Sequence, residues 1–379
     1  MKIYYWSPFF TKIATIRAVI NSAESLINFS KLKQYEVSLI NAIGEWDVYQ
    51  KSINENINII NLNKNNLINY LPKNSFLKSR FSYFVIFFWN FFKLKNLINS
   101  NKPDYLIIHL MTSLPICLSI FLNPKTKIIL RISGLPKINI FRYILWKTFE
   151  KKIYKITCPT QSTYDYLVKK NIFKKDKIEI LNDPIVNIKE YLIKKKESFE
   201  LRDSAKKKYI VGIGRLTKQK NFELLIKFFR NLLNKKSELE LIIIGEGEEE
   251  EKLKQLTNEF GIMNKVHFVG YQENVFKYLI NSECFILTSL WEDPGFVIVE
   301  AALSNVPIIS SNCPNGPKEI IKNNGYLFNN NDLNDLSDKF DQFLSTDKEK
   351  VLKNKIILKK RIRKFTLFNH YKKLENILE

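Results

Sequence analysis

The chain has 379 residues, which at about 150 residues per domain gives two or three domains. Hydrophobic residues make up 45% and charged residues 26%, which excludes a disordered polymer. The four cysteines are scattered and form no C-x-x-C pair, which excludes a disulfide scaffold and fits a reducing compartment. The three histidines also lack metal-site spacing, so the sequence excludes a zinc site. The net charge of +22 indicates a polyanionic partner (nucleic acid, anionic membrane or phosphate-bearing substrate), or in part a general bias toward Lys, Asn and Ile.

Short apolar runs alternate with helical patterns through the first half of the chain. Strands are predicted at residues 2–6, 37–42, 57–62, 105–110, 127–133, 155–159 and 177–181. Residues 16–27 place their apolar side chains on one helical face. Because the strand candidates are apolar on both faces and alternate with helices, they predict a parallel sheet with helices packed on both sides.

Neither a signal peptide nor a membrane span is predicted. The N-terminal stretch MKIYYWSPFF lacks the long apolar core of a signal peptide, and no run of about 18 apolar residues occurs. The segment FSYFVIFFWNFF (81–92) comes closest and is flanked by Lys and Arg. It is either a core helix of the first domain or a segment that inserts shallowly into an anionic leaflet.

Residues 189–207 are highly charged and lose the strand rhythm, so we expect a linker there. A second set of strands is predicted at 209–214, 239–247, 265–270, 283–289 and 306–311. The expected fold class is α/β, with two Rossmann-like, doubly wound parallel-sheet domains facing a central cleft, where ligands bind at the carboxyl ends of the strands. The predicted segments are an N-terminal domain at 1–188, the linker at 189–207, a C-terminal domain at 208–355 and a C-terminal helix at 356–379.

Two glycine-containing turns follow strands of the second set. Gly214 and Arg215 come directly after a strand, and Lys220 lies at a helix start. Glycine lets a backbone approach a ligand closely, and cations at a helix N-terminus suit a phosphate. In a Lys-rich chain, two solvated surface charges are an equally good interpretation. Gly245 makes a second tight turn after the next strand.

The strongest pattern lies near residue 300. Glu292 precedes a Pro-Gly turn, Gly295 opens an apolar helix, and Glu300 lies in the second turn of that helix. The free N–H groups at the helix start predict an anion site. A Glu in an apolar helix needs hydrogen-bond donors, such as sugar or ribose hydroxyls, or a cation in a core salt bridge.

In this order and spacing, the motifs resemble the retaining glycosyltransferases of the E-x7-E family, which have the GT-B fold. The matching segments are GRL-x3-K at 214–220, G-E-G at 245–247, E-x7-E at 292–300 and CPNGPKEI at 313–320. The resemblance covers most of residues 205–330 and only the outline of the first half. It implies sugar transfer from a nucleotide sugar, UDP by family habit, to a lipid-linked or oligosaccharide acceptor in bacterial cell-surface polysaccharide or lipopolysaccharide biosynthesis.

The resemblance also implies roles for single residues. Arg215 and Lys220 would hold the donor diphosphate, Glu300 the ribose, and Glu292 the donor sugar. The implied donor-binding set is Gly214, Arg215, Lys220, Gly245, Gly270, Tyr271, Glu292, Gly295, Phe296, Val297 and Glu300. The implied catalytic set is Glu292, His109, Arg215 and Lys220. His109 ends a strand where the family often has a histidine near the reacting sugar carbon, although a histidine at a strand end is otherwise usually a satisfied core residue.

Acceptor binding and the metal requirement are further expectations. The family's first loop commonly carries a Gly-Gly pair, whereas the loop at 7–15 has no glycine, so Thr11 or Lys12 is the expected substitute. No D-x-D sequence lies near a strand end, so we expect Lys and Arg to replace a metal, with no cofactor. The resemblance implies retention of the anomeric configuration, and because no clear nucleophilic carboxylate is seen, we expect front-face attack by the acceptor. In similar proteins the C-terminal tail crosses back to the first domain, so the same is expected of 356–379. We also expect a cytoplasmic protein that lies peripherally on the inner face of the cytoplasmic membrane.

Two other functions fit the sequence less well. Another GT-B enzyme, such as a phosphorylase or a nucleotide-sugar epimerase, is disfavoured by the intact E-x7-E and R-x4-K motifs. A non-enzymatic basic protein that binds nucleic acid would need clustered cations with interleaved aromatic residues. The positive residues of this chain are dispersed, so we expect no nucleic-acid partner.

Overall fold

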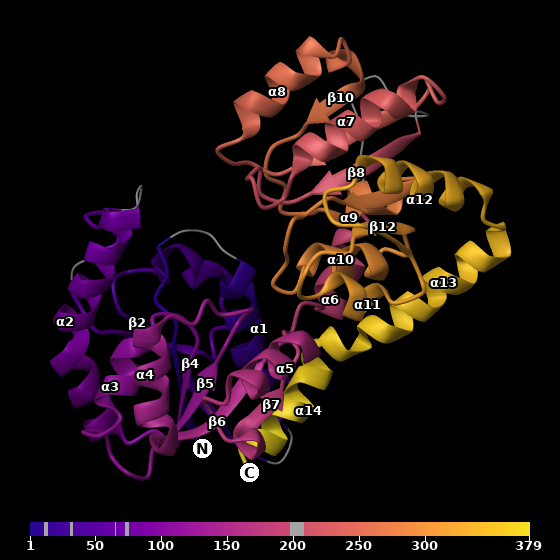
Figure 1. The fold of residues 1–379 in the computed structure, drawn as a ribbon. Helices are drawn as coiled ribbons and strands as arrows, with labels where there is room; N and C mark the ends of the chain where they lie inside the picture. The colour runs from indigo at the N-terminus through magenta and orange to yellow at the C-terminus, as the bar shows by residue number, and fades with distance from the viewer. Residues whose placement is uncertain (11–13, 31–32, 65, 73–75, 198–207) are drawn as a thin grey trace. The chain divides into compact units, whose positions relative to one another are not determined.

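The chain folds into two units, each built around a parallel sheet (Figure 1). The computed structural model describes residues 1–10, 14–30, 33–64, 66–72, 76–197 and 208–379. Unit 1 contains Met1–Pro184 and Leu367–Glu379, and unit 2 contains Ile185–Thr366. Two Rossmann-like parallel-sheet domains, expected from the alternation of apolar runs and helices, are therefore confirmed.

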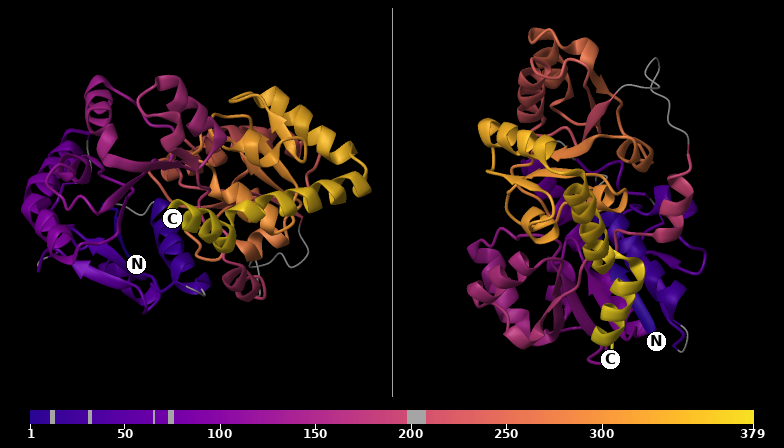
Figure 2. Two further views of the ribbon diagram at one scale, coloured as in Figure 1. Left: turned by 90° about the horizontal axis from the view of Figure 1, so that it is seen from below. Right: turned by 90° about the vertical axis from the view of Figure 1, so that its right-hand side faces the viewer.

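Unit 1 has a seven-stranded sheet, within the described residues, in the order β3-β2-β1-β4-β5-β6-β7. The strands are β1 (Lys2–Trp6), β2 (Glu36–Asn41), β3 (Asn58–Asn61), β4 (Tyr105–Ile108), β5 (Lys127–Arg131), β6 (Ile153–Cys158) and β7 (Ile178–Ile180). One face is covered by α2 (Phe76–Asn101), α3 (Ser113–Leu118), α4 (Ile140–Phe149) and α5 (Gln161–Lys170). The other is covered by α1 (Ala14–Phe29) and α14 (Leu367–Ile377), which lie side by side (Figure 2).

Unit 2 has a six-stranded sheet among its described residues, in the order β10-β9-β8-β11-β12-β13. Its strands are β8 (Tyr209–Ile213), β9 (Glu240–Ile244), β10 (Val266–Phe268), β11 (Cys284–Leu287), β12 (Ile308–Ser311) and β13 (Tyr326–Phe328). One core contains α9 (Phe276–Ile280), α10 (Phe296–Leu303), α11 (Pro317–Ile321) and α13 (Lys348–Arg361). The other contains α7 (Phe222–Leu233), α8 (Glu250–Glu259) and α12 (Leu333–Ser345).

The predicted linker and C-terminal helix differ from the structure. The range 189–207 contains most of helix α6 (Ile188–Lys194), which packs on unit 2 through Tyr191. The rings of Tyr191 and Phe276 meet edge to face, with their centroids 5.0 Å apart. Residues 198–207 lie outside the described part. The range 356–379 is not one helix. α13 stays in unit 2, a 3-10 turn buries Ile362 and Phe365 in the unit 2 core, and only α14 joins unit 1.

Helix α2 contains the aromatic segment 81–92 and has both a buried and an exposed side. Ile86, Leu94 and Ile98 are buried in the unit 1 core, whereas Phe88 is exposed. Among the described helices, none combines the length and apolarity that crossing a bilayer requires.

The assignment of α14 to unit 1 generates a stability prediction. Leu374 is buried on α14, so Leu374→Ala removes apolar contacts and leaves a cavity. We expect the free energy of unfolding to fall by about 2–5 kcal/mol, measured by denaturant unfolding. Leu352→Ala on α13 is the matched control, because Leu352 is half exposed and its loss changes stability by less than about 0.5 kcal/mol. Equal losses in the two variants would contradict the packing of α14 against unit 1.

Candidate active site

Three loops meet at the carboxyl edge of the unit 2 sheet. The loop after β8 contains Gly214, whose N–H donates to Ile244 O at 2.9 Å. Two residues on, the N–H of Leu216 donates to Glu246 O at 2.8 Å. The loop after β9 is in turn joined to the loop after β10, because Gly245 N–H donates to Gly270 O at 2.9 Å. These backbone contacts hold the ends of three adjacent strands together.

The contact between the first two loops requires glycine. Gly245 has φ +141°, and a Cβ atom there would lie 1.9 Å from Gly214 O. At Gly247 a Cβ would lie 2.3 Å from Leu216 O. A side chain at either position would have to move backbone, so the sequence G-E-G is explained by close packing of the loops.

A buried ion pair lies beside this junction. Lys220 Nζ donates to Glu292 Oε1 at 2.6 Å, and the two side chains are 13% and 4% exposed. The Ser289 hydroxyl donates to the same oxygen at 2.6 Å. The stem of Lys220 runs along Gly214, where a Cβ would be 3.2 Å from it. The pair therefore fixes a cation next to the glycine loops.

The loop that carries Glu292 is held from behind by the segment 313–316. Glu292 N–H donates to Pro314 O at 3.1 Å, and Asn315 Nδ2 donates to Asp293 Oδ1 at 2.8 Å. A Cβ at Gly316 would lie 1.9 Å from Pro294 O. The two parts of the predicted motif region are thus packed on each other, which holds the Glu292 carboxylate inside.

Cys313 lies near the ion pair. Burial raises the pKa of its thiol to about 11; Ser311 lowers that pKa, Glu292 raises it and Lys220 lowers it. The thiol is therefore protonated at neutral pH.

The predicted nucleobase loop lies at the same edge. Gly270 has φ +67°, and the following N–H, that of Tyr271, donates to Glu246 Oε1 at 3.2 Å. The Tyr271 ring is 62% exposed. Glu246 and Ser289 are residues that the sequence did not single out as site residues, although each lies within the quoted motifs or three residues before one.

The other predicted donor-binding residues lie in the β8 loop and at α10. Arg215 is exposed at the β8 loop, and within the described part of the chain no ion pair to its guanidinium is found. Gly295, at φ +90°, precedes α10, which begins with Phe296 and Val297. Glu300 lies in the second turn of α10 and is partly exposed.

The predicted acceptor-binding residues, Thr11 and Lys12, lie outside the described residues. Among the residues that the structure does describe, no group of three or more His, Cys, Asp and Glu side chains is arranged to hold a metal ion.

His109 lies in unit 1, directly after β4, and is 8% exposed. With Arg131, Asp183 and His370 it lines a small internal cavity. Its Nδ1 atom is buried and has no hydrogen-bond partner among the described residues. Burial, with the charge of Arg131, lowers the pKa of His109 well below its usual value, so the ring is neutral.

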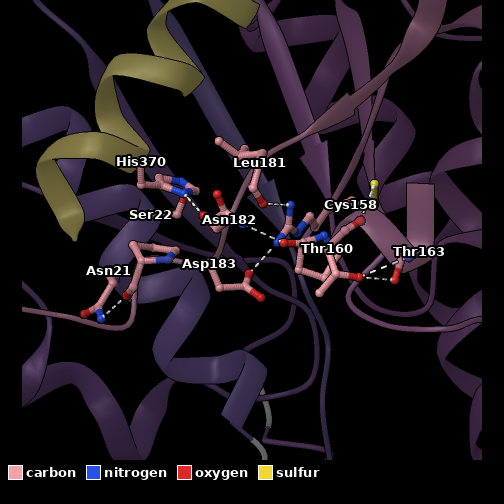
Figure 3. A network of polar contacts seen from close by, with 12 residues as sticks. Asn21, Ser22, Cys158, Thr160, Thr163, Leu181, Asn182, Asp183 and His370 are labelled. Carbon is pink, nitrogen blue, oxygen red and sulfur yellow. Dashed lines mark hydrogen bonds and ion pairs between the residues drawn. The ribbon is translucent and has the colours of Figure 1, made fainter. Parts of the chain in front are cut away.

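Several residues that line this cavity belong to a polar network that the sequence analysis missed. Figure 3 shows the network. Arg131 donates to Asp183 Oδ1 at 2.5 Å and to Leu181 O at 2.6 Å, and both charged side chains are buried. Burial raises the pKa of Asp183, and Arg131 lowers it. Pairing and hydrogen bonding are what allow two such charges to be buried.

His370 links α14 to this network. Its Nδ1 lies 2.7 Å from Asn182 O, which can only accept, so Nδ1 carries the proton. Nε2 therefore accepts from the Ser22 hydroxyl, at 2.8 Å, and Ser22 lies 3.0 Å from the Tyr5 hydroxyl. Burial lowers the pKa of His370 to about 3.

A known protein family matches the segment of the chain that contains the three loops and the ion pair. Residues 193–361 match the family described as glycosyl transferases group 1. The match covers 169 of the 379 residues and leaves the rest of the chain unmatched by this family model. The matched segment includes Gly214, Lys220, Gly245, Gly270 and Glu292.

Two relatives are glycosyltransferases. An uncharacterized glycosyltransferase of Methanocaldococcus jannaschii is 33% identical over 257 residues, which is 61% of this chain and 61% of that protein. The N-acetylgalactosamine-N,N'-diacetylbacillosaminyl-diphospho-undecaprenol 4-alpha-N-acetylgalactosaminyltransferase of Campylobacter jejuni is 31% identical over 153 residues, 40% of this chain and 41% of that protein. The match thus spans less than two thirds of either relative.

The fold also matches solved structures. The structure of Anabaena HepE in complex with UDP and glucose superposes with a TM-score of 0.72 at 12% identity, and covers 100% of this chain and 99% of that chain. The fold of the chain is accordingly GT-B, as expected from the motifs.

The glycine packing predicts a severe effect of Gly245→Ala. The added methyl group meets the Gly214 carbonyl, so we expect a loss of about 3 kcal/mol or more in the free energy of unfolding. Gly261→Ala is the control, because Gly261 also has positive φ (+65°) but nothing lies within 4 Å of its added Cβ, and it should lose only about 1 kcal/mol. Denaturant unfolding measures both; similar losses would show that backbone strain, not the contact, requires glycine.

The environment of His370 predicts a pH effect. The folded pKa is about 3, below the ordinary value of 6.5, so the unfolded chain binds more protons between these values and stability falls on acidification. From about pH 7 to about pH 5 this single group costs about 2 kcal/mol. The wild type should therefore lose about 2 kcal/mol more than His370→Gln over this interval in denaturant unfolding. Parallel pH profiles of the two proteins would contradict this assignment.

Proposed function

We propose that the protein is a glycosyltransferase that moves a sugar from a UDP-sugar to a lipid-linked or oligosaccharide acceptor in bacterial cell-surface polysaccharide or lipopolysaccharide biosynthesis. The observation that carries the proposal is the cation of Lys220, fixed by Glu292 at the junction of three glycine loops, within a segment that matches the glycosyl transferases group 1 family. The Anabaena structure that shares the fold holds UDP and glucose, which supports the choice of donor.

The carboxyl edge of the unit 2 sheet suits the diphosphate of the donor. Lys220 has two ammonium protons beyond the one on Glu292, and Arg215 is exposed on the same loop. Preorganised cations stabilise the charge that develops on a leaving diphosphate, and they do so most strongly where water is excluded. We assign the diphosphate to Arg215 and Lys220, the ribose to Glu300, and the donor sugar to Glu292, Phe296 and Val297.

The reaction then needs no divalent ion, because Arg215 and Lys220 supply the positive charge. We propose retention of the anomeric configuration by front-face attack, and His109 stays a proposed catalytic residue. Departure of the diphosphate and attack of the acceptor hydroxyl on the same sugar face keep the configuration. The hydroxyl proton passes to the departing phosphate oxygen, so the charges balance without a nucleophile on the protein.

The acceptor is proposed to be carried by a lipid, with the enzyme at the inner face of the cytoplasmic membrane. The name of the Campylobacter relative specifies a diphospho-undecaprenol acceptor, which supports this class. An enzyme held at the membrane surface encounters a membrane-bound acceptor more often than a freely diffusing enzyme does.

Release of UDP from a panel of UDP-sugars tests the donor site. In Lys220→Ala the leaving group loses its fixed cation, so we expect the rate to fall about 10²- to 10³-fold. Glu300→Ala should raise KM for the donor. Lys218→Ala is the control, because Lys218 is an exposed lysine of the same loop and its loss should leave the rate near that of the wild type.

Thermal shift with UDP alone provides a second measurement that needs no acceptor. UDP should raise the melting temperature of the wild type and of Lys218→Ala, but not of Lys220→Ala. If UDP stabilises Lys220→Ala as well as the wild type, Lys220 does not contact the diphosphate and the proposed donor site is wrong.

A further inference from the structure

Helix α2 carries an apolar stripe on the side away from the core. Its buried residues follow one another at intervals of four: Ser82, Ile86, Asn90, Leu94 and Ile98. Phe81, Phe84, Phe88 and Phe92 lie on the opposite side of the helix and are 61%, 64%, 70% and 69% exposed. Single exposed apolar residues are normal on a protein surface, whereas four exposed phenylalanines in one row form a contiguous apolar patch, which is unusual.

Helix α4 and the end of α3 extend this apolar surface. Ile140, Phe141 and Ile144 are exposed on α4, and Ile120 and Phe121 are exposed just after α3. The three helices are neighbours in unit 1, with α3 packed against both α2 and α4 (Figure 1). We call the exposed residues of α2, residues 120–121 and α4 together the α2–α4 face.

Two contacts join α2 to the exposed residues that follow α3. The Phe91 ring on α2 lies 6.4 Å from the Phe121 ring, measured between centroids. The ammonium group of Lys95 on α2 also lies over the Phe121 ring.

The α2–α4 face lies in a part of the chain where basic residues greatly outnumber acidic ones. Between residues 56 and 149 there are 13 Lys and Arg residues but only one acidic residue, Asp104. Arg142 and Lys147 are exposed on α4, and Lys95 Nζ on α2 lies 5.3 Å from the centre of the Phe121 ring. Cations thus surround and interleave the exposed aromatic rings.

We propose that the α2–α4 face seats the protein on an anionic lipid bilayer. Phenylalanines that enter the acyl boundary leave water, and each Lys or Arg near an anionic leaflet contributes about 1 kcal/mol. Charge decides between this occupant and a second copy of the chain, because two such faces would bring like charges together. Of the two interpretations of 81–92, core helix and membrane segment, the proposal takes the second for the exposed side of α2 and extends it to α4. Phe87, which packs on the core, is excluded from the contact.

The inference deepens the acceptor half of the proposed function, since a bilayer is where a lipid-linked acceptor resides. It rests on unit 1 alone and makes no use of the donor site. Vesicle binding requires neither UDP-sugar nor acceptor, so its failure and the failure of the transfer assay are distinguishable.

Co-sedimentation with vesicles tests the proposal on the full chain. We expect binding to vesicles of phosphatidylcholine and phosphatidylglycerol, weaker binding to phosphatidylcholine alone, and loss of binding as salt screens the lipid charge. The double variant Phe84→Glu with Phe88→Glu removes two apolar anchors and adds repulsion, so its affinity should fall at least about 10-fold.

The control is Leu352→Glu with Ile356→Glu, which places the same two charges on half-exposed apolar positions of α13 in unit 2. It should bind vesicles like the wild type, and circular dichroism of both variants should show retained helix. Wild-type protein that stays in the supernatant overturns the proposal, as does a Phe84, Phe88 variant that still binds fully. Sedimentation velocity that shows a wild-type dimer and a monomeric Phe84, Phe88 variant, without vesicle binding, would assign the face to a second copy instead.

Discussion

The buried pair of Lys220 and Glu292 constrains the site more than any other contact. Removing both charges from water is costly, and the cost is offset only because they meet at 2.6 Å and Ser289 donates to the same carboxylate oxygen. The pair also joins two loops that are 72 residues apart in sequence. A lysine side chain held in this way has little conformational freedom, so its remaining ammonium protons stay in a fixed position. Such preorganisation favours the binding of a phosphate.

Close contact between backbones provides the platform for this lysine. Gly245 and Gly247 allow the loop after β9 to lie directly on the loop after β8, and Gly316 does the same for the loops after β11 and β12. Larger residues would separate the loops and move Lys220 and Glu292 apart. Glycines in these motifs therefore shape the site without touching a ligand, whereas the sequence analysis assigned Gly245 to the ligand itself.

The sequence predicted the sheets well, because buried parallel strands are apolar on both faces and stand out between helices. It missed β13, Tyr326–Phe328, whose three residues lie between glycine and asparagine and are too few to form a pattern. It missed Tyr191 of α6, because one buried ring in a lysine-rich segment resembles a linker. Arg131 and Asp183 were beyond its reach for another reason: their pairing depends on the order of the strands, not on local spacing.

Both units place their polar groups at the carboxyl ends of parallel strands, but they stabilise them differently. In unit 1, Arg131 ends β5 and is neutralised by Asp183 after β7, while His109 and His370 stay uncharged in the same interior. In unit 2, the cation of Lys220 keeps part of its surface exposed. A charge fully satisfied inside the protein serves to fix the strand ends, whereas one with protons left over can meet a ligand. The two cations thus differ in how completely they are paired inside the protein. This difference, more than residue type or motif, is the physical reason for the proposal that the donor phosphates bind to unit 2.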